Sequence, residues 1–442
     1  MDNIFYLLNI GVSGIKGIKK EVQLDFYKKT VDKKFNSEKY RIKAIYGENG
    51  SGKSALITAV KIFKDMCLQE TYLTETKNQD FLREMINKSS HEFKFYCEYL
   101  VDLAPSKEVY YYEVILGLNN RGNYEVQREI LKVKNGNYPN DNYRTVFKIC
   151  DGELIEITCD EKEKQLAEKK SLNLLSSRTF IHIVMSMYAE SKNIRIFGDA
   201  SIYTLVFLGL PLYLEIYLDE EDQHELYLFK KQLRDNALNE NGVPDSWKNI
   251  GRNLNEFSGV GEKIISKEFF AEYQKRVEQL TQFLKVFKPN LVSIDVDKKE
   301  NGDVYECDLN LNYGDYSINR EFESTGIKKL IRLFDCFGAV DRNGIVFIDE
   351  MDSNLNDVYL CKLLEYFKYY GKGQLCFTTH NLSPMTVLRD NKNSIDFLSS
   401  DNHLVSWTAR GNATPENCYR NGMIEDSPFN VDATDFIGIF GE

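Results

Sequence analysis

The sequence predicts an α/β fold built from a mixed sheet, an antiparallel β lobe and a helical insertion that interrupts them. Three observations support this prediction. A glycine-rich loop stands between a strand-like and a helix-like segment at residues 47–54, strand-like and helix-like segments alternate again after residue 289, and the stretch between is rich in Glu, Lys, Leu and Gln. We therefore expect three parts: 1–159 with the loop and the β lobe, 160–288 as the helical insertion, and 289–442 as the second half of the sheet.

The first strands are expected at residues 4–10 and 21–26, around a turn that contains Gly14 and Gly17. A lysine-rich connector then leads to the apolar run 42–46. Residues 1–11 carry Asp2 and no basic segment ahead of their apolar residues, which favours a first strand over a signal peptide.

The loop at residues 47–54 fits the pattern G-x-x-x-x-G-K-[ST], and it lies between the strand-like run 42–46 and the helix-like run 55–66. Its glycines let the backbone approach a polyphosphate, and the exposed N–H groups at a helix start favour anionic oxygens. Lys53 adds a positive charge and Ser54 a hydroxyl for Mg²⁺. The candidate ATP-binding residues are Gly47, Asn49, Gly50, Ser51, Gly52, Lys53, Ser54 and Ala55.

The β lobe is expected from three apolar and aromatic runs at 93–100, 109–116 and 124–133. Turn-forming residues at 119–123 separate the last two runs, which predicts an antiparallel meander.

The insertion is expected to be compact and helical. Residues 161–174, 212–238 and 267–286 are mostly free of Gly and Pro, but none sustains the heptads of a long coiled coil. The apolar run 202–214 is 13 residues long, whereas a bilayer span needs about 20, so a buried core element is expected and no membrane contact.

After Pro289, strand-like segments at 291–297, 305–311, 344–348 and 374–378 alternate with helix-like segments at 327–340 and 358–370. This alternation predicts a parallel sheet packed with helices. Residues 409–440 are expected to form an irregular tail with a short final strand.

Polar residues at strand ends complete the candidate site. Asp349 can bind Mg²⁺ together with Ser54, and Glu350 beside it can polarise an attacking water. His380, at the end of the strand-like run 374–378, is suited to a γ-phosphate oxygen, although a histidine that caps a loop is the alternative.

A second cluster of small polar residues, Ser324, Thr325 and Gly326, opens a predicted helix. Such a cluster suits an anion, and it is also what an ordinary N-cap looks like; both readings can hold together.

Composition limits the remaining classes of function. A formal net charge of -11 argues against a surface that coats nucleic acid, although it leaves room for a local basic groove. The nine cysteines form no C-x-x-C pair and the five histidines are scattered, so no zinc spacing is present. Reduced thiols in a cytoplasmic protein are expected.

In this order, the motifs resemble those of ATP-binding-cassette ATPase heads, specifically the branch of chromosome-maintenance, Rad50-like and overcoming-lysogenization-defect-like proteins. They are also similar to the small bacterial AAA-type ATPases of phage-defence (abortive infection) systems. Residues 47–54 resemble the Walker A motif, 345–350 the Walker B motif, His380 the switch histidine, and 324–326 a variant signature. The separation of 296 residues (349 - 53) between Lys53 and Asp349 suits a head with a central insertion.

The resemblance implies a P-loop NTPase that binds ATP and Mg²⁺ and hydrolyses ATP slowly, with Glu350 and His380 as catalytic residues. It also implies a homodimer or higher homo-oligomer, in which Ser324, Thr325 and Gly326 act in trans on the nucleotide of the second copy. A separate effector, a nuclease or toxin, and a phage-derived trigger are the expected partners, because the 62 residues after His380 (442 - 380) are too few for an appended nuclease.

Two features depart from the family pattern. The signature lacks the Ser-Gly-Gly form that is common in transporters, and the glutamine loop is not assigned, although Gln79 and Gln127 are available.

Three alternatives remain from the sequence. A DNA-maintenance ATPase of the recombination-mediator type would bind DNA as a dimer, through basic patches at Lys328, Lys329 and Arg332 or at Lys285 and Lys288. An ordinary solvated surface is the favoured alternative for these charged residues. A transporter subunit would need a shorter head, and a kinase would need an acceptor pocket that the sequence does not show.

Overall fold

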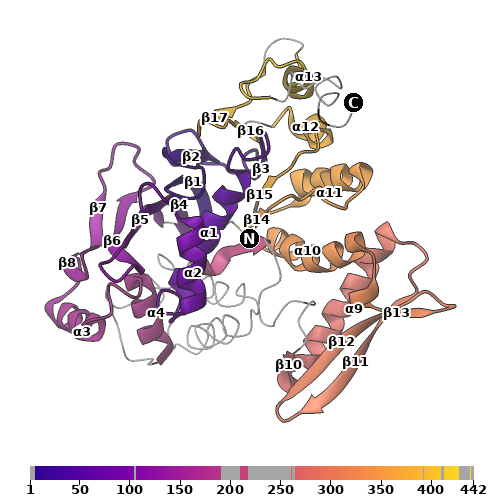
Figure 1. Cartoon of the computed structure of the whole chain (residues 1–442), viewed down its shortest axis with the longest axis horizontal. Helices are drawn as coiled ribbons and strands as arrows, with labels where there is room; N and C mark the ends of the chain where they lie inside the picture. The colour runs from indigo at the N-terminus through magenta and orange to yellow at the C-terminus, as the bar shows by residue number, and fades with distance from the viewer. Residues whose placement is uncertain are drawn as a thin grey trace.

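In the computed structural model of the chain, a six-stranded sheet carries the candidate site (Figure 1). The structure describes residues 5–103, 106–190, 210–217, 260, 264–391, 393–409, 413–427 and 439. The strands lie in the order β17-β16-β3-β15-β14-β9. Their bounds are β3 Ile42–Tyr46, β9 Leu214–Tyr217, β14 Ile345–Ile348, β15 Gln374–Thr378, β16 Ile395–Leu398 and β17 Leu404–Ser406. All neighbours pair in parallel except β16 and β17.

Side chains alternate between the two faces of this sheet, as the period of a strand requires. Ile45 of β3 and Phe347 of β14 belong to the core shared with the β lobe, whereas Ala44 and Val346 belong to the core on the opposite face. Helix α1 (Lys53–Leu68) lies on the first face. The second face is covered by α10 (Thr325–Asp341), α11 (Asp357–Tyr370) and α12 (Ser383–Leu388), as Figure 1 shows.

A seven-stranded antiparallel sheet forms the β lobe, in the order β2-β1-β4-β5-β6-β7-β8. Its bounds are β1 Phe5–Ser13, β2 Val22–Asp25, β4 Glu92–Leu103, β5 Ser106–Leu118, β6 Tyr124–Asn135, β7 Arg144–Cys150 and β8 Glu153–Ile157. Phe63 of α1 stacks on Phe95 of β4 with ring centroids 4.6 Å apart, so α1 fills the space between the two sheets. The helices beside this lobe are α2 (Thr76–Met85), α3 (Glu161–Ser171) and α4 (Phe180–Glu190).

One buried side chain joins the two sheets directly. The Gln374 amide accepts a hydrogen bond from the Leu7 backbone N–H (2.7 Å) and donates one to the Leu7 carbonyl (2.9 Å). The Gln374 side chain thus pairs with the β1 backbone in the way that a neighbouring strand would, and it links β15 to β1.

A third, smaller core packs α9 (Phe270–Phe287) and α10 against a separate antiparallel sheet, which projects from the lower right of Figure 1. This sheet contains β10 (Ile264–Ser266), β11 (Ser293–Asn301), β12 (Val304–Asn312) and β13 (Ser317–Asn319). Short 3-10 turns, η1 (Lys267–Phe269) and η2 (Arg320–Phe322), precede α9 and α10. The remaining elements are α6 (Leu210–Tyr213) and α13 (Pro415–Arg420).

The structure confirms the α/β class, the antiparallel meander at 93–133 and the helices expected at 327–340 and 358–370. Two expectations are wrong. The segments 291–297 and 305–311 do not join the parallel sheet, because they pair with each other as the antiparallel β11 and β12. Residues 214–217, expected inside a helix, form β9, which pairs in parallel with β14 and gives the central sheet its edge strand.

Other expectations fall partly outside the described residues, including 218–238, most of the apolar run 202–214 and the final strand of the tail. Within the part of the chain that the structure describes, no helix has the length and apolar character needed to cross a membrane.

Candidate active site

Three adjacent parallel strands deliver the candidate residues to one edge of the central sheet. The loop 47–54 follows β3, His380 follows β15, and Asp349 and Glu350 follow β14, while β15 pairs with both of the other two strands. Because parallel strands point the same way, their carboxyl ends lie at the same edge, which is where open α/β sheets bind ligands. Strand pairing therefore brings Lys53 and Asp349 to the same edge of the sheet, although they are 296 residues apart in sequence (349 - 53).

The backbone of the loop 47–54 turns tightly at two glycines. A side chain at Gly47 would place its Cβ 2.4 Å from the Leu398 carbonyl oxygen, which no residue but glycine can accommodate. Gly52 has φ 105°, in the region that favours glycine, and α1 begins at the next residue, Lys53. The loop thus ends at the positive end of a helix of 16 residues.

The ammonium of Lys53 lies across this loop. It donates hydrogen bonds to the carbonyl oxygens of Gly47 (2.9 Å) and Glu48 (2.8 Å), and only 6% of the residue is exposed. Burial lowers the pKa of Lys53, and the negative charge of Asp349, the largest opposing influence, raises it. Lys53 is therefore a largely desolvated cation with carboxylates near it.

The loop fits a polyphosphate by several local features. Ser51 Oγ is buried and lacks a hydrogen-bond partner among the described residues, so the loop keeps a polar group unsatisfied. Space is open where a side chain at Gly50 would point. Among the residues that the structure describes, the Lys53 ammonium bonds only to carbonyl oxygens, which phosphate oxygens can replace as acceptors.

A single hydroxyl organises the two acidic residues after β14. Thr378 Oγ1 donates to Asp349 Oδ1 (2.5 Å) and accepts from the Glu350 backbone N–H (2.8 Å). Glu350 has φ 47°, a left-handed conformation that is uncommon outside glycine. Its side chain is exposed at the sheet edge while its backbone is fixed, which is the placement a general base for water requires.

Lys329 of α10 holds the other side of Glu350. Its ammonium donates to the Glu350 carbonyl oxygen and to Ser353 Oγ. Only 5% of Lys329 is exposed, and burial lowers its pKa, with Asp352 as the largest opposing influence. Lys329 therefore belongs neither to a basic surface patch nor to the solvated surface, because its ammonium is buried and bonded within the protein.

No group of three or more His, Cys, Asp or Glu side chains in the described ranges could hold a metal ion. Ser54 and Asp349 are thus too few to form a complete Mg²⁺ site from protein atoms alone. Mg²⁺ usually keeps waters and takes substrate phosphates as ligands beside one or two carboxylates, so this small donor set fits a metal that arrives with a nucleotide.

His380 is exposed at the end of β15, next to the buried Thr379. The Thr379 N–H donates to the Ile45 carbonyl (3.2 Å), which fixes this strand end beside β3. Asn381, the next residue after His380, donates to Asp357 Oδ1 of α11 (2.6 Å). The segment is therefore anchored on both sides of His380.

The cluster 324–326 lies beside the turn 351–355 of the same chain. Ser324 Oγ accepts from the Ile327 N–H (3.4 Å), so the N-cap reading is confirmed. Thr325 Oγ1 donates to Asn354 Oδ1 (3.4 Å), and a side chain at Gly326 would come within 2.8 Å of the Asn354 carbonyl oxygen. Among the described residues, no hydrogen bond joins this cluster to the loop 47–54, and its action in trans stays a prediction.

The sequence did not identify Thr378 or Lys329 as residues that position Asp349 and Glu350, because these roles depend on contacts between distant segments. Thr378 does have a signal, since it ends a strand-like run directly before Thr379 and His380. Gln79, one of the two residues available for the glutamine loop, is buried, and its amide is bonded to the Leu73 and Tyr124 backbone.

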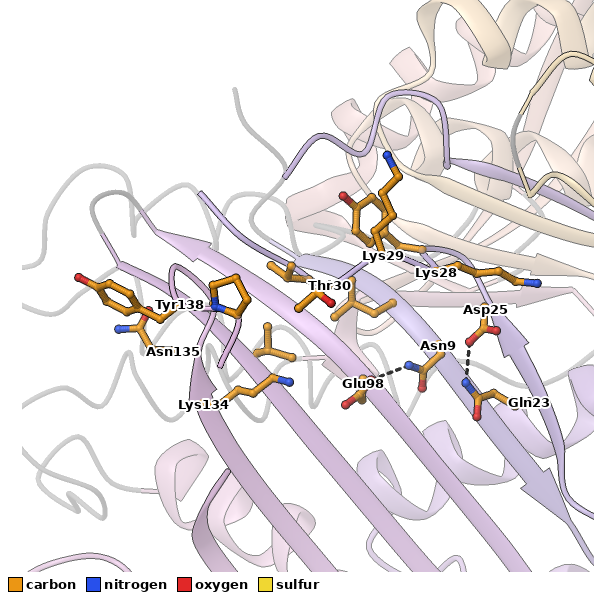
Figure 2. Close-up of a pocket in the computed structure, with 16 residues that line it drawn as sticks. Asn9, Gln23, Asp25, Lys28, Lys29, Thr30, Glu98, Lys134, Asn135 and Tyr138 are labelled. Carbon is orange, nitrogen blue, oxygen red and sulfur yellow. Dashed lines mark hydrogen bonds between the residues drawn. The ribbon is translucent and has the colours of Figure 1, made fainter. Parts of the chain in front are cut away.

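A pocket of about 470 Å³ lies elsewhere, between the β lobe and the segment 27–31 (Figure 2). Its wall includes Glu98, on the opposite face of β4 from Phe95, which packs on α1. Asn9 donates to Glu98 Oε2 (2.6 Å) and Gln23 donates to Asp25 Oδ1 (2.6 Å), as Figure 2 shows. Asn9 Oδ1 is buried and has no hydrogen-bond partner among the described residues. The lining of the pocket includes none of the candidate site residues.

Comparison of the chain with known protein families finds no family that matches it, and comparison with curated proteins finds no matching relative.

Proposed function

We propose that this protein binds ATP with Mg²⁺ and hydrolyses it, as a slow nucleotide-dependent switch. The observation that carries the proposal is the convergence of three strand ends: Lys53 after β3, His380 after β15 and Glu350 after β14. Each end supplies one requirement for hydrolysis of the phosphoanhydride bond to the γ-phosphate, namely a cation for the polyphosphate, a donor to its terminal oxygens and a base for water.

Roles follow from the positions of the side chains. The loop 47–54 and Lys53 hold the polyphosphate, and Ser54 and Asp349 hold Mg²⁺, which supplies charge neutralisation at the phosphates. Glu350 orients and polarises the attacking water, while Thr378 keeps Asp349 and Glu350 in register with each other. His380 donates to the oxygen on which charge develops.

The site is completed by a second copy of the chain. The cluster 324–326 is exposed or half-buried and lies at a helix start, yet it is bonded to Asn354 of its own chain rather than to its own loop 47–54. A homodimer that places this cluster over the second loop would supply donors to both nucleotides. ATP binding then favours the closed pair and hydrolysis releases it.

The biological role proposed is control of a separate effector, a nuclease or toxin, in bacterial anti-phage defence. Its support is the resemblance of the motif set to phage-defence ATPases. The DNA-maintenance alternative is weakened by the burial of Lys329, which removes one of the three cations expected on α10.

The test is the rate of phosphate release from ATP and Mg²⁺ by the purified protein, together with its mass in solution. Wild type should release phosphate slowly. Glu350→Gln should bind ATP without releasing phosphate and should accumulate as dimers or larger assemblies, and Lys53→Ala should do neither. Wild-type protein that binds no ATP would refute the proposal, and ATP use only with an added acceptor would replace hydrolysis by phosphoryl transfer.

A further inference from the structure

Tyr46 of β3 packs against two other elements, β16 and α13. It is the last residue of β3 and directly precedes Gly47, and only 1% of it is exposed. Its ring lies 5.9 Å from that of Phe397 in β16 and 6.3 Å from that of Tyr419 in α13. The aromatic packing therefore fixes the ring, whereas the polar hydroxyl of Tyr46 needs a hydrogen-bond partner of its own.

That hydroxyl is buried, and it makes no hydrogen bond with the described residues. Asp352, in the turn 351–355, has a buried Oδ1 that also lacks a partner there. Burial is the main cause that raises the pKa of Tyr46, and the negative charge of Asp352 is the second. The backbone brings the two residues together, because the Met351 N–H donates to the Thr378 carbonyl (3.0 Å) and Thr378 pairs with Ile45, the residue before Tyr46. One of the two unpaired atoms is a donor and the other an acceptor.

Such a pair is costly in the state described. A buried polar group without a partner destabilises a protein by about 1–3 kcal/mol, and native structures keep few of them. A donor and an acceptor that are both unpaired would recover that free energy if a movement joined them.

The turn that carries Asp352 is also tied to the start of α10. Lys329 bonds to Ser353, and Asn354 contacts Thr325 and Gly326. A shift at the start of α10 therefore displaces the neighbours of Asp352. In the proposed dimer this helix start is the surface that meets the second nucleotide.

We propose that Tyr46 is a positioning residue: when the two copies close on ATP, its hydroxyl donates to Asp352 and couples the start of α10 to the loop 47–54. The inference rests on the proposed ATPase function. Through this hydrogen bond, a change at the contact with the second subunit would shift Tyr46, the residue directly before Gly47.

Tyr46→Phe removes the hydroxyl and keeps the ring. The resting protein loses an unpaired polar group, so its thermal midpoint should stay the same or rise. The closed state loses a hydrogen bond to a carboxylate, so turnover should fall about tenfold. Unchanged or higher stability together with slower turnover is a combination that simple damage to the fold does not produce.

Tyr6→Phe is the matched control. Tyr6 is also 1% exposed, but its hydroxyl donates to the Tyr40 carbonyl (2.7 Å), away from the strand ends. This variant should have a lower thermal midpoint, because it leaves a carbonyl unpaired, and a wild-type turnover.

A double-mutant cycle with Asp352→Ala, which removes the acceptor, tests the pairing. If the two groups act together, the double variant Tyr46→Phe/Asp352→Ala should be no slower than Asp352→Ala alone, whereas multiplied effects would contradict the pairing. Wild-type turnover in Tyr46→Phe overturns the inference and leaves the ATPase proposal intact. Absence of ATP hydrolysis in the wild type would instead show that the proposed function itself has failed.

Discussion

Replacement of Thr378 by valine should slow hydrolysis strongly while preserving the fold. Thr378 is fully buried, and valine has nearly the same shape without a hydroxyl. The change removes the donor to Asp349 Oδ1 (2.5 Å) and the acceptor for the Glu350 N–H (2.8 Å). Both acidic residues then lose the contact that fixes them relative to each other.

The expected magnitude follows from those two hydrogen bonds. A hydrogen bond to a charged group contributes about 1.5–3 kcal/mol and a neutral one about 0.5–1.5 kcal/mol. If about 2 kcal/mol of the sum is lost from the transition state, turnover falls roughly 30-fold, because each 1.36 kcal/mol is tenfold. Phosphate release at saturating ATP and Mg²⁺ measures this, and filter binding measures ATP affinity separately.

Two companion variants make the result specific. Thr378→Ser keeps the hydroxyl and should retain most of the activity. Thr281→Val removes another buried threonine hydroxyl, which donates to the Val277 carbonyl within α9 (2.9 Å), and should leave turnover unchanged. Wild-type turnover in Thr378→Val, or equally slow turnover in Thr378→Ser, would refute the assigned role.

Three further predictions concern stability. Gln374→Leu should lower the free energy of unfolding in urea by about 2 kcal/mol or more, because both backbone groups of Leu7 lose their partner; an unchanged midpoint would contradict the bridge between the sheets. Asp396→Ala should cost about 3–5 kcal/mol, since it leaves the Lys43 ammonium, 2.6 Å away and 1% exposed, buried without its counter-charge; a shift below 1 kcal/mol would argue against this pair. Burial raises the pKa of Glu129 from 4.5 to about 7, so the folded chain holds an extra proton between these values. The stability from this group is full below about pH 4.5 and is lost as the pH rises through 7, and Glu129→Gln should flatten that part of the profile of unfolding free energy against pH.

The sequence was most informative where the local pattern and the long-range structure agree. The run 345–348 is wholly apolar and forms the fully buried β14, as expected for a central parallel strand. The segment 305–311 alternates polar and apolar residues, and this is the signature of the half-buried antiparallel β12 that it forms. The segment does not join the parallel sheet because strands buried on both faces are nearly all apolar, whereas its alternation suits an antiparallel strand with one exposed face.

The site shows the same division. Lys53, Asp349 and Glu350 could be identified because each stands at the end of a strand-like run. Thr378 and Lys329 could not be assigned roles, since their contacts join segments more than 20 residues apart in sequence: |378 - 349| = 29 and |350 - 329| = 21. Pairing of strands and packing of helices decide those contacts, and neither follows from local composition.

The most direct test of the central claim compares ATP retention and phosphate release in one sample of Glu350→Gln. This variant should retain ATP and release little or no phosphate, whereas the wild type should convert bound ATP to ADP and phosphate. Phosphate release at the wild-type rate by Glu350→Gln would contradict the claim that the ends of β3, β15 and β14 form a single hydrolytic site.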